Sequence, residues 1–327
     1  MAGGARRLPG PPRLSTPAAS VVIPNWNGAA LLPTCLDGLR RQSVPDFETI
    51  LVDNASRDES VSLVSQHYPE VRLTRLSRNF GFAGAVNAGI QAARAGTVVL
   101  LNSDTEVAPV WLEALLSGFA DHPDAGMVAS RIMLFDRRDV FHSAGDLYGR
   151  DGVPRNRGVW EGDRGQYERR EYVFGACGCG AAYRRSLFSD VGVFDERFFF
   201  NLEDVDLAWR AQQLGYRCLY EPRALVYHHL SATGGGRVAS FYTGRNTLAV
   251  LLRDVPTPLL ARHWRGMLRA QLQVSTDALR AWRGEAARAR LRGQLAGLAF
   301  ALSLLPERRE IERRRRVPLD YLESLLA

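Results

Sequence analysis

Residues 20–28 read SVVIPNWNG, an apolar run rich in β-branched residues that ends in a polar turn. β-Branched residues favour strands, whereas Pro and Gly interrupt them. Similar apolar runs occupy residues 49–52 and 97–101, and segments with helical spacing of Leu, Val and Ile lie between the three runs. Strands that alternate with helices predict an α/β fold, with a mainly parallel sheet covered by helices on both faces.

Polar side chains follow each of these runs. They are Pro24, Asn25 and Asn27 after the first, Asp53 after the second, and Asn102, Ser103 and Asp104 after the third. Ligands of such sheets bind outside the carboxyl ends of the strands, so these residues should share one crevice. A dinucleotide site would need G-x-G-x-x-G after the first strand, and the turn at residues 24–28 contains a single glycine.

A second informative stretch, residues 198–210, reads FFFNLEDVDLAWR and combines three acids with aromatic residues. We expect a helix here that is capped by Asn201 and ends at Gly215. Glu203 and Asp204 then lie in the first turn, where the helix dipole favours ionised carboxylates and the nearby phenylalanines disfavour them. That opposition can hold a general base near working pH, although acids also simply decorate helix starts.

Six short motifs occur in a fixed order along residues 20–255. They are residues 20–28, Asp53-Asn54-Ala55-Ser56, residues 78–84, Asn87-x-Gly89, Asn102-Ser103-Asp104-Thr105 and Glu203-Asp204-Val205-Asp206. In this order they resemble family 2 glycosyltransferases, in particular bacterial rhamnosyltransferase-like and galactofuranosyltransferase-like members that build cell-surface polysaccharide. The resemblance implies the GT-A fold and an inverting transfer of sugar from a UDP- or dTDP-sugar to a glycan acceptor, which we expect to be lipid-linked.

The resemblance also implies the residues that bind the nucleotide sugar. They are Pro24, Asn25, Asn27, Asp53, Asn79, Gly81, Asn87, Asn102, Ser103 and Asp104. The carboxylate of Asp53 can accept a hydrogen bond from the imide N–H of uracil or thymine, with helix capping as the competing interpretation. The glycines and asparagines of residues 78–89 would let the backbone approach a nucleotide or phosphate.

The implied cofactor is Mn²⁺ or Mg²⁺, because Asp104 matches the end of the family's Asp-x-Asp metal motif. Asn102 replaces the first acid, so one negative charge is lost and metal affinity could fall. His228 matches a metal-binding His of some members and would suit Mn²⁺ better than Mg²⁺; a structural His is the alternative. The loss of an acid leaves open a catalytically inactive sugar-nucleotide-binding subunit, and a nucleotidyltransferase is a minor further option.

On the acceptor side, the resemblance implies that Asp204 is the catalytic base and that Glu203 and Asp206 orient the acceptor or the helix. Gly175 and Ala176 belong to a segment that would leave room for the reacting sugars, unless their small size reflects a tightly packed strand. Residues 135–170 are predicted to form a long loop or small hairpin near the acceptor. Residues 231–237, which contain three glycines, could form a lid over the donor or a surface linker.

Charge is uneven along the 327 residues, whose net charge is +7. Residues 262–327 contain 14 Arg against 7 acids, which accounts for the whole excess. We predict that residues 259–327 form a basic helical segment after a GT-A domain at 20–258. Its apolar run at 295–305 is shorter than the roughly 20 residues needed to cross a bilayer. We therefore expect this run to pack on the domain or to contact anionic lipid. The alternative is a solvated helical face. No nucleic-acid-binding motif occurs, so nucleic acid is not an expected partner.

The four cysteines are scattered, and Cys177-x-Cys179 lacks the usual zinc spacing. They are interpreted as small buried residues in a reducing compartment. Residues 1–19 are rich in Gly, Pro and Arg and lack the apolar run of a signal peptide, which predicts a disordered tail. The expected location is therefore cytoplasmic and peripheral, on the inner face of the plasma membrane.

Overall fold

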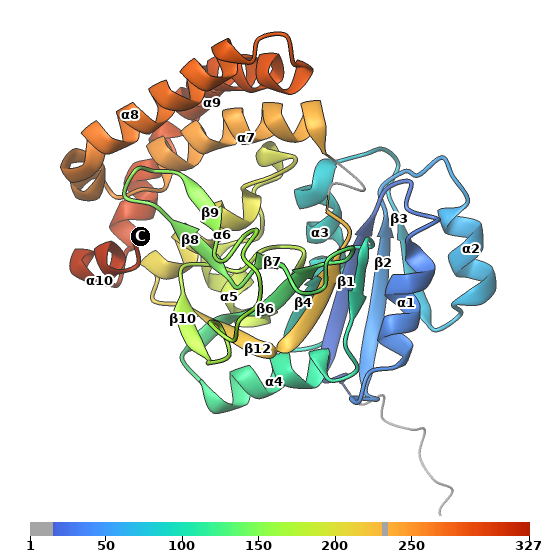
Figure 1. The fold of residues 1–327 in the computed structure, drawn as a ribbon. Coiled ribbons are helices and arrows are strands. Elements are labelled where there is room, and N and C mark those ends of the chain that lie inside the picture. Colours follow the sequence, from blue (N-terminus) through green and yellow to red (C-terminus); the bar gives the residue numbers. More distant parts are fainter. Residues whose placement is uncertain (1–15, 231–234) are drawn as a thin grey trace, which may run out of the picture.

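A ten-stranded mixed sheet runs through the centre of the molecule (Figure 1). The computed structural model describes residues 16–230 and 235–327. The strands follow the order β10-β12-β6-β11-β4-β1-β2-β3, with β5 beside β12 and β7 beside β6, while β8 and β9 form a separate hairpin. The strands are β1 (Ala19–Asn25), β2 (Phe47–Asp53), β3 (Val71–Arg75), β4 (Thr97–Leu101), β5 (Thr105–Val107), β6 (Ala125–Leu134), β7 (Phe141–Ser143), β8 (Asp146–Tyr148), β9 (Pro154–Asn156), β10 (Glu171–Val173), β11 (Gly180–Arg184) and β12 (Arg217–His228).

Helices cover both faces of the sheet, as predicted. They are α1 (Leu32–Arg40), α2 (Ser60–His67), α3 (Gly81–Ala92), α4 (Trp111–Asp121), α5 (Arg185–Val191), the 3₁₀ turn η1 (Glu196–Phe198), α6 (Glu203–Gln213), α7 (Gly236–Arg253), α8 (Thr257–Arg280), α9 (Glu285–Arg314) and α10 (Leu319–Ser324). Val21 and Ile23 of β1 share a core with α1 and α4, whereas Val22 points to the opposite core with α3, α5 and α6. This alternation follows from the period of two along a strand.

The parallel strands bring their carboxyl ends to one edge. β1 pairs with β2 in a register that sets Asn25 beside Asp53, and β4 lies on the other side of β1. Helix α3 packs closely on this part of the sheet, because a Cβ at Gly89 would lie 2.1 Å from Cγ1 of Val22. The glycine of the Asn87-x-Gly89 motif therefore serves helix-to-sheet packing.

The other half of the sheet positions the end of β12. Strand β11 runs antiparallel between β4 and β6, and β12 runs parallel to β6. The short strand β5 pairs with β12 so that Thr105 lies opposite His228. The polar turn after β4 and the end of β12 are thus fixed next to each other by backbone pairing.

The C-terminal residues form a layer of long helices beside the sheet (Figure 1), and α7 packs along α9. The contact is close, because a Cβ at Gly293 would lie 2.1 Å from the carbonyl oxygen of Phe241. The apolar run 295–305 lies within α9. Across residues 16–230 and 235–327, we find no helix with an apolar stretch sufficient to span a bilayer.

Two predicted segments lie at the edge of the described chain. Ala19, expected to end the tail, is the first residue of β1 and is buried. Residues 231–234, the first part of the predicted lid, lie outside the described residues, and helix α7 begins shortly after them.

Candidate active site

A crevice opens where the carboxyl ends of β1 and β4 meet the loop before α6. It consists of a cavity of about 350 Å³ and an adjoining one of about 140 Å³, and Asn102, Asp104 and Phe82 line both. The smaller cavity is lined by the predicted donor residues Pro24, Asn25, Asn79, Gly81, Asn102, Ser103 and Asp104. The larger cavity is lined by the acids of α6 and by His228. The structure therefore brings seven of the ten predicted donor residues, both predicted metal ligands and the predicted base into one crevice.

Two buried amide oxygens belong to residues that line the crevice. Oδ1 of Asn25 and Oδ1 of Asn102 are buried and have no hydrogen-bond partner among the described residues. Buried polar atoms are almost always hydrogen-bonded in native proteins, so such atoms in a cavity wall indicate a missing ligand or water. Their position at two neighbouring strand ends is that predicted for the donor.

The predicted base-reading residue, Asp53, does not line either cavity. Its carboxylate accepts a hydrogen bond from the backbone N–H of Ser56 at 3.3 Å, as in a turn cap. The next residue, Asn54, lines the smaller cavity and donates to Oδ1 of Asn79 at 3.0 Å and to the carbonyl oxygen of Gly81 at 2.9 Å. Asn54 and Asn79 therefore fix the loop that enters α3.

Three further predicted donor residues hold the walls of the crevice in place. Oδ1 of Asn27 accepts a hydrogen bond from the N–H of Arg57 at 2.7 Å. The side chain of Asn87 donates to the carbonyl oxygen of Phe194 at 2.8 Å and lines neither cavity. Gly81 has a φ of +77°, and a Cβ there would lie 2.3 Å from the carbonyl oxygen of Phe199. Its lack of a side chain thus allows contact with the loop before α6.

Asp104 and His228 meet at the junction of the two cavities. Nε2 of His228 lies 3.2 Å from Oδ1 of Asp104, and both side chains are buried. Burial lowers the pKa of His228, but the neighbouring Cys179 and Asp104 outweigh burial and raise the pKa to about 10. An environment that stabilises a proton so strongly also favours a metal cation.

The loop before α6 has an unusual backbone conformation. Phe199, Asn201 and Leu202 all have positive φ angles, between 62° and 67°. Asn246 of α7 fixes this loop by donating to three of its carbonyl oxygens, including that of Asn201 at 2.6 Å. Such strained backbone persists only where its surroundings enforce it, which is common at functional sites.

This conformation corrects the predicted helix start. The helix begins at Glu203, with Leu202 rather than Asn201 in the N-cap position. The side chain of Asn201 instead donates to Oγ1 of Thr243 in α7 at 3.2 Å. A local capping preference lost to a tertiary contact with α7, whereas Gly215 follows the helix as predicted, with a φ of +91°.

Asp204 is partly buried in the wall of the larger cavity. Its Oδ2 accepts a hydrogen bond from the N–H of Gly178 at 3.0 Å, and its Oδ1 accepts one from the N–H of Val205 at 2.8 Å. Burial raises the pKa of Asp204, and these two N–H groups partly oppose that rise. The N–H groups stabilise the ionised form and fix the orientation of the carboxylate.

Two other acids surround Asp204. Burial and the charge of Asp204 raise the pKa values of Glu203 and Asp146 well above their ordinary range. Oε2 of Glu203 and Oδ1 of Asp146 are buried without a hydrogen-bond partner among the described residues. Neighbouring carboxyls cannot all ionise. Among these three, only the carboxylate of Asp204 accepts hydrogen bonds from two backbone N–H groups, so Asp204 is best able to carry the negative charge.

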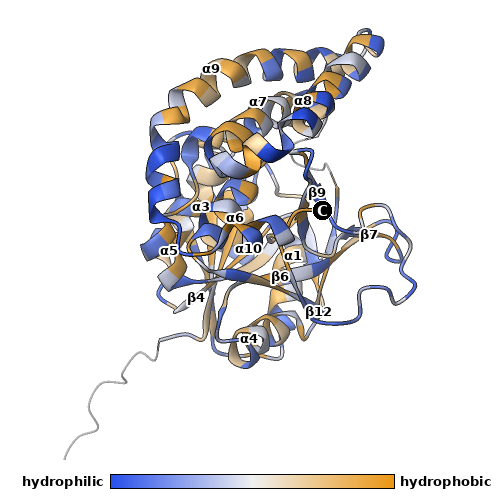
Figure 2. Ribbon diagram, turned by 90° about the vertical axis from the view of Figure 1, so that its left-hand side faces the viewer, coloured by the Kyte–Doolittle hydropathy of each residue, from blue (hydrophilic) through white to orange (hydrophobic). Residues whose placement is uncertain are grey.

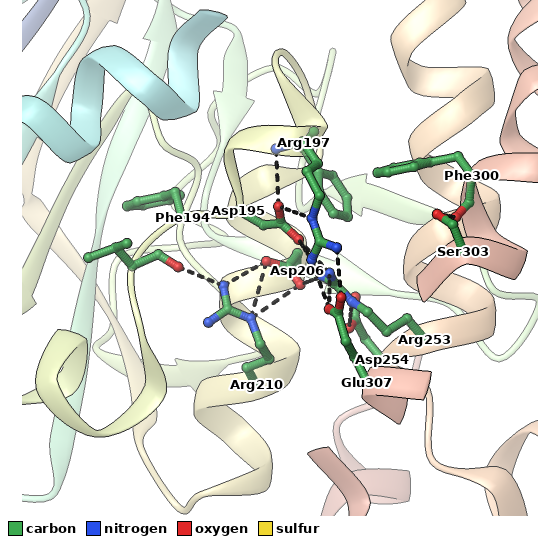
Figure 3. A network of polar contacts seen from close by, with 12 residues as sticks. Phe194, Asp195, Arg197, Asp206, Arg210, Arg253, Asp254, Phe300, Ser303 and Glu307 are labelled. Carbon is green, nitrogen blue, oxygen red and sulfur yellow. Dashed lines mark hydrogen bonds and ion pairs between the residues drawn. The ribbon is translucent and has the colours of Figure 1, made fainter. Parts of the chain in front are cut away.

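Asp206, predicted on the acceptor side, does not line the larger cavity and instead lies within a network of arginines and acids (Figure 3). It is fully buried and forms ion pairs with Arg210 at 2.6 Å and with Arg253 of α7. Arg253 also contacts Asp195 and Asp254, and Glu307 of α9 joins the same network. Asp206 therefore serves the other predicted role, which was to fix the helix, by tying α6 to the C-terminal helices.

The predicted acceptor-side pair Gly175 and Ala176 also lies outside the cavity wall. A Cβ at Gly175 would lie 2.8 Å from Cβ of Ala208 in α6, so this glycine allows close packing. Cys177, Gly178 and Cys179, the next residues, line the cavity instead. The packing alternative thus accounts for Gly175, while other residues of the same small-residue segment line the cavity.

Several cavity residues had no signal in the sequence. His142 of β7, Asp146 of β8 and Asn156 of β9 all come from the polar stretch 135–170, which forms the predicted small hairpin beside the larger cavity. No periodicity or motif marks them, because the surrounding chain is irregular. Asn246 was missed as well, since it acts from α7 through the backbone of the loop before α6.

Comparison with known proteins identifies the family. The glycosyl transferase family 2 profile matches residues 20–192. An N-acetylglucosaminyl-diphospho-decaprenol L-rhamnosyltransferase of Mycobacterium tuberculosis is 30% identical over 288 residues, which cover 80% of this chain and 91% of that protein. The O-antigen biosynthesis protein RfbC of Myxococcus xanthus is 31% identical over 235 residues, which cover 68% of this chain and 18% of that protein.

Solved structures share the fold. The mannosyltransferase PcManGT of Pyrobaculum calidifontis, in complex with GDP-Man and Mn²⁺, aligns with a TM-score of 0.55 at 19% identity over 95% of this chain and 86% of that one. GalNAc-T7 with UDP, GalNAc and Mn²⁺ aligns with a TM-score of 0.58 at 17% identity over 72% of this chain and 48% of that one. The fold is GT-A, and the chain belongs to glycosyl transferase family 2.

Proposed function

We propose that the protein is an inverting glycosyltransferase that moves a sugar from a UDP- or dTDP-sugar to a lipid-linked glycan acceptor in cell-surface polysaccharide synthesis. The observation that carries this proposal is the position of Asp204. Its carboxylate is fixed by two backbone N–H groups in the wall of the larger cavity. This cavity adjoins the smaller one, which the predicted donor residues line. A base so placed can act on an acceptor hydroxyl while the donor lies against the strand ends.

Asp204 would remove the proton from the acceptor hydroxyl as the hydroxyl oxygen attacks the anomeric carbon. The bond from that carbon to the diphosphate breaks on the opposite side, so the configuration inverts. Glu203 and Asp146, whose pKa values are raised well above the ordinary range, would remain protonated and could donate hydrogen bonds to the acceptor. Of the three carboxyls, Asp204 would act as the base, and Glu203 and Asp146 would be neutral hydrogen-bond donors.

A divalent cation fits beside Asp104. The carboxylate of Asp104, the partnerless Oδ1 of Asn102 and Nε2 of His228 present oxygen and nitrogen atoms, a set that suits Mn²⁺ better than Mg²⁺. Such a cation would neutralise charge on the departing diphosphate. His228 could be a ligand or could donate its Nε2–H to Asp104. Asn25, Ser103 and Asn79 would contact the donor from the other side of the smaller cavity.

The rhamnosyltransferase relative supports a deoxysugar donor and a polyprenyl diphosphate-linked acceptor, because its name specifies both. A screen of UDP- and dTDP-sugars would test the proposal, with release of nucleoside diphosphate as the measurement. We expect turnover that EDTA abolishes and Mn²⁺ or Mg²⁺ restores. Binding of nucleotide sugar without any product would instead support the inactive binding subunit, which the replacement of an acid by Asn102 makes conceivable.

The C-terminal helices offer a surface for the lipid-linked acceptor. Exposed apolar residues recur on one stripe of α8 and on one of α9. They are Trp264, Leu268, Leu272 and Leu279 on α8, Trp282 in the turn after it, and Leu295, Leu298, Leu302 and Leu305 on α9. The two helices pack side by side, and apolar residues alternate with polar ones along them (Figure 2). Exposed arginines, including Arg265, Arg269 and Arg280, accompany the α8 stripe.

Apolar side chains flanked by arginines match the interface of an anionic bilayer, where the former enter the acyl boundary and the latter contact phosphates. The protein would therefore bind peripherally at the cytoplasmic face. Co-sedimentation with phosphatidylglycerol vesicles should show binding that weakens at high salt, and Leu268→Glu with Leu272→Glu should abolish it. A concentration-dependent dimer without vesicle binding would assign the stripe to a second copy instead.

A further inference from the structure

Three buried side chains form a cluster of potential metal ligands, of which only His228 has a place in the proposed transfer reaction. His142 of β7, Cys179 just before β11 and His228 at the end of β12 each offer one ligand atom, and these atoms all lie within 4.8 Å of one another. All three residues are less than a tenth exposed and come from strands of one sheet. The cluster is therefore held by rigid elements, and it borders the larger cavity.

The two imidazoles face each other through the same kind of atom. Nδ1 of His142 lies 3.1 Å from Nδ1 of His228. Zn–N bonds of about 2.0–2.1 Å at tetrahedral angles place two nitrogens about 3.3 Å apart, so this separation matches that of two ligands on one zinc ion. The sulfur of Cys179 lies within 4.8 Å of a ring nitrogen of each histidine, and it would have to move toward them to complete three bonds.

The outer nitrogens of both imidazoles are also occupied. Nε2 of His228 lies 3.2 Å from the carboxylate of Asp104, and Nε2 of His142 lies 3.3 Å from the side-chain amide of Asn156. Metal-binding histidines typically donate their second N–H to such a carboxylate or carbonyl oxygen, which fixes the ring and its tautomer. His228 has this arrangement, whereas His142 faces Nδ2 of Asn156 and would acquire it when that side-chain amide rotates by about 180° and presents its oxygen.

We propose that His142, Cys179 and His228 bind one Zn²⁺ ion, through two Nδ1 atoms and a thiolate. The proposal concerns a site separate from the Mn²⁺ or Mg²⁺ ion of the proposed transfer reaction, since a thiolate with two imidazoles selects a borderline-soft metal and disfavours hard cations. Three protein ligands leave a fourth position, which would face the cavity and take water or an acceptor oxygen.

Of the two cations, only the zinc ion would bind His228. A neutral imidazole that binds zinc through Nδ1 keeps its proton on Nε2, so it donates to Asp104 rather than joining the second cation. Asp104 and Asn102 then remain for the diphosphate cation. The zinc ion would therefore fix the orientation of Asp104 through His228.

Cobalt(II) substitution tests the site directly and without an activity assay. The full-length protein, stripped with a chelator, should bind one Co²⁺ per chain and show intense visible d–d bands together with a thiolate-to-cobalt charge-transfer band. Zn²⁺ should bleach both stoichiometrically. A wild-type protein that shows no thiolate charge transfer with Co²⁺ would overturn the proposal, whatever the behaviour of the variants.

Variants then identify the ligands. Cys179→Ala and His142→Ala should each lose the charge-transfer band or the tetrahedral d–d intensity, whereas Cys218→Ala, which removes another buried thiol from β12, should keep both. Asp104→Ala should retain the band with affinity lower by roughly 10–100-fold, as for loss of a metal ligand's partner. Persistence of the band in Cys179→Ala would assign it to another thiol and reject the site.

The same variants separate this proposal from the proposed function. Binding of Mn²⁺ in the presence of UDP, followed by electron paramagnetic resonance, should be lost in Asp104→Ala and retained in Cys179→Ala. Loss of zinc with retained sugar transfer would leave the zinc site established and limit it to a structural role. Sugar transfer by a protein that never binds Co²⁺ or Zn²⁺ would reject the zinc site and keep the enzyme.

Discussion

Asp204 and Asp206 lie two residues apart on α6 and have opposite surroundings. Two residues correspond to about 200° around a helix, so one carboxylate points into the cavity and the other into the interior between α6 and α7. Asp204 has backbone N–H groups as partners, whereas Asp206 has two arginines. Asp206 is fully buried and Asp204 only partly, and only Asp206 has a full counter-charge.

The difference shows how one helix can carry both a reactive acid and a structural one. Burial without a cation raises the pKa of Asp204, which brings its proton affinity toward that of a general base. Ion pairs with arginine keep buried acids ionised. Burial alone would raise the pKa of Asp195 in the same network, but Arg197 and Arg253 outweigh burial and lower the pKa to about 2. The C-terminal helices thus supply the counter-charges that hold α6 in place.

The largest effect should follow from Asp204→Asn. Because the amide cannot accept the acceptor proton, turnover should fall by about 10²-fold or more, the scale of general-base catalysis. Binding of nucleotide sugar, measured by calorimetry, should remain. The matched variant Asp206→Asn should still bind the nucleotide sugar, but its fold should be less stable. Near-normal transfer by Asp204→Asn would remove the assigned division between the two acids.

Removal of the central arginine should affect folding rather than chemistry. Arg253→Ala leaves Asp206 and Asp254 buried without their main counter-charge, so the free energy of unfolding should fall by about 3–5 kcal/mol. Urea denaturation followed by circular dichroism measures this loss. Arg197, which is half exposed and pairs with Asp195, is the control, and its replacement by Ala should cost at most about 1 kcal/mol. Equal losses in the two variants would show that the network is not centred on Arg253.

The smallest effect concerns pH and separates the two kinds of acid. The ionised form of Asp204 is required for transfer, so the rate should decline as the pH falls through its raised pKa. Stability from Asp195, whose folded pKa is about 2, is present above its ordinary pKa near 4 and is lost as the pH falls toward 2. Transfer should therefore disappear at a higher pH than the fold. A coincident loss of activity and of circular dichroism signal would contradict this order.

Local pattern was enough to predict strands β1, β2 and β4, the crevice at their carboxyl ends and the place of Asp204 in the first turn of a helix. These features depend on alternation, on apolar runs and on short-range spacing, which are all visible in the chain. The roles of single residues were harder to predict: Asp53 caps a turn beside the cavity, Asn54 lines it, and Gly175 packs against Ala208. Adjacent residues point in different directions, so a displacement of one position changes the role.

By itself, the sequence determined the α/β class, the order of the motifs and a basic C-terminal segment, because these depend on periodicity and composition. Only the tertiary structure decided that Asn201 would contact α7 instead of capping α6, and that Arg253 would neutralise Asp206. It alone brought His142 and Cys179 beside His228. Such contacts join residues tens of positions apart, and their free energies arise only when sheet and helices have packed together.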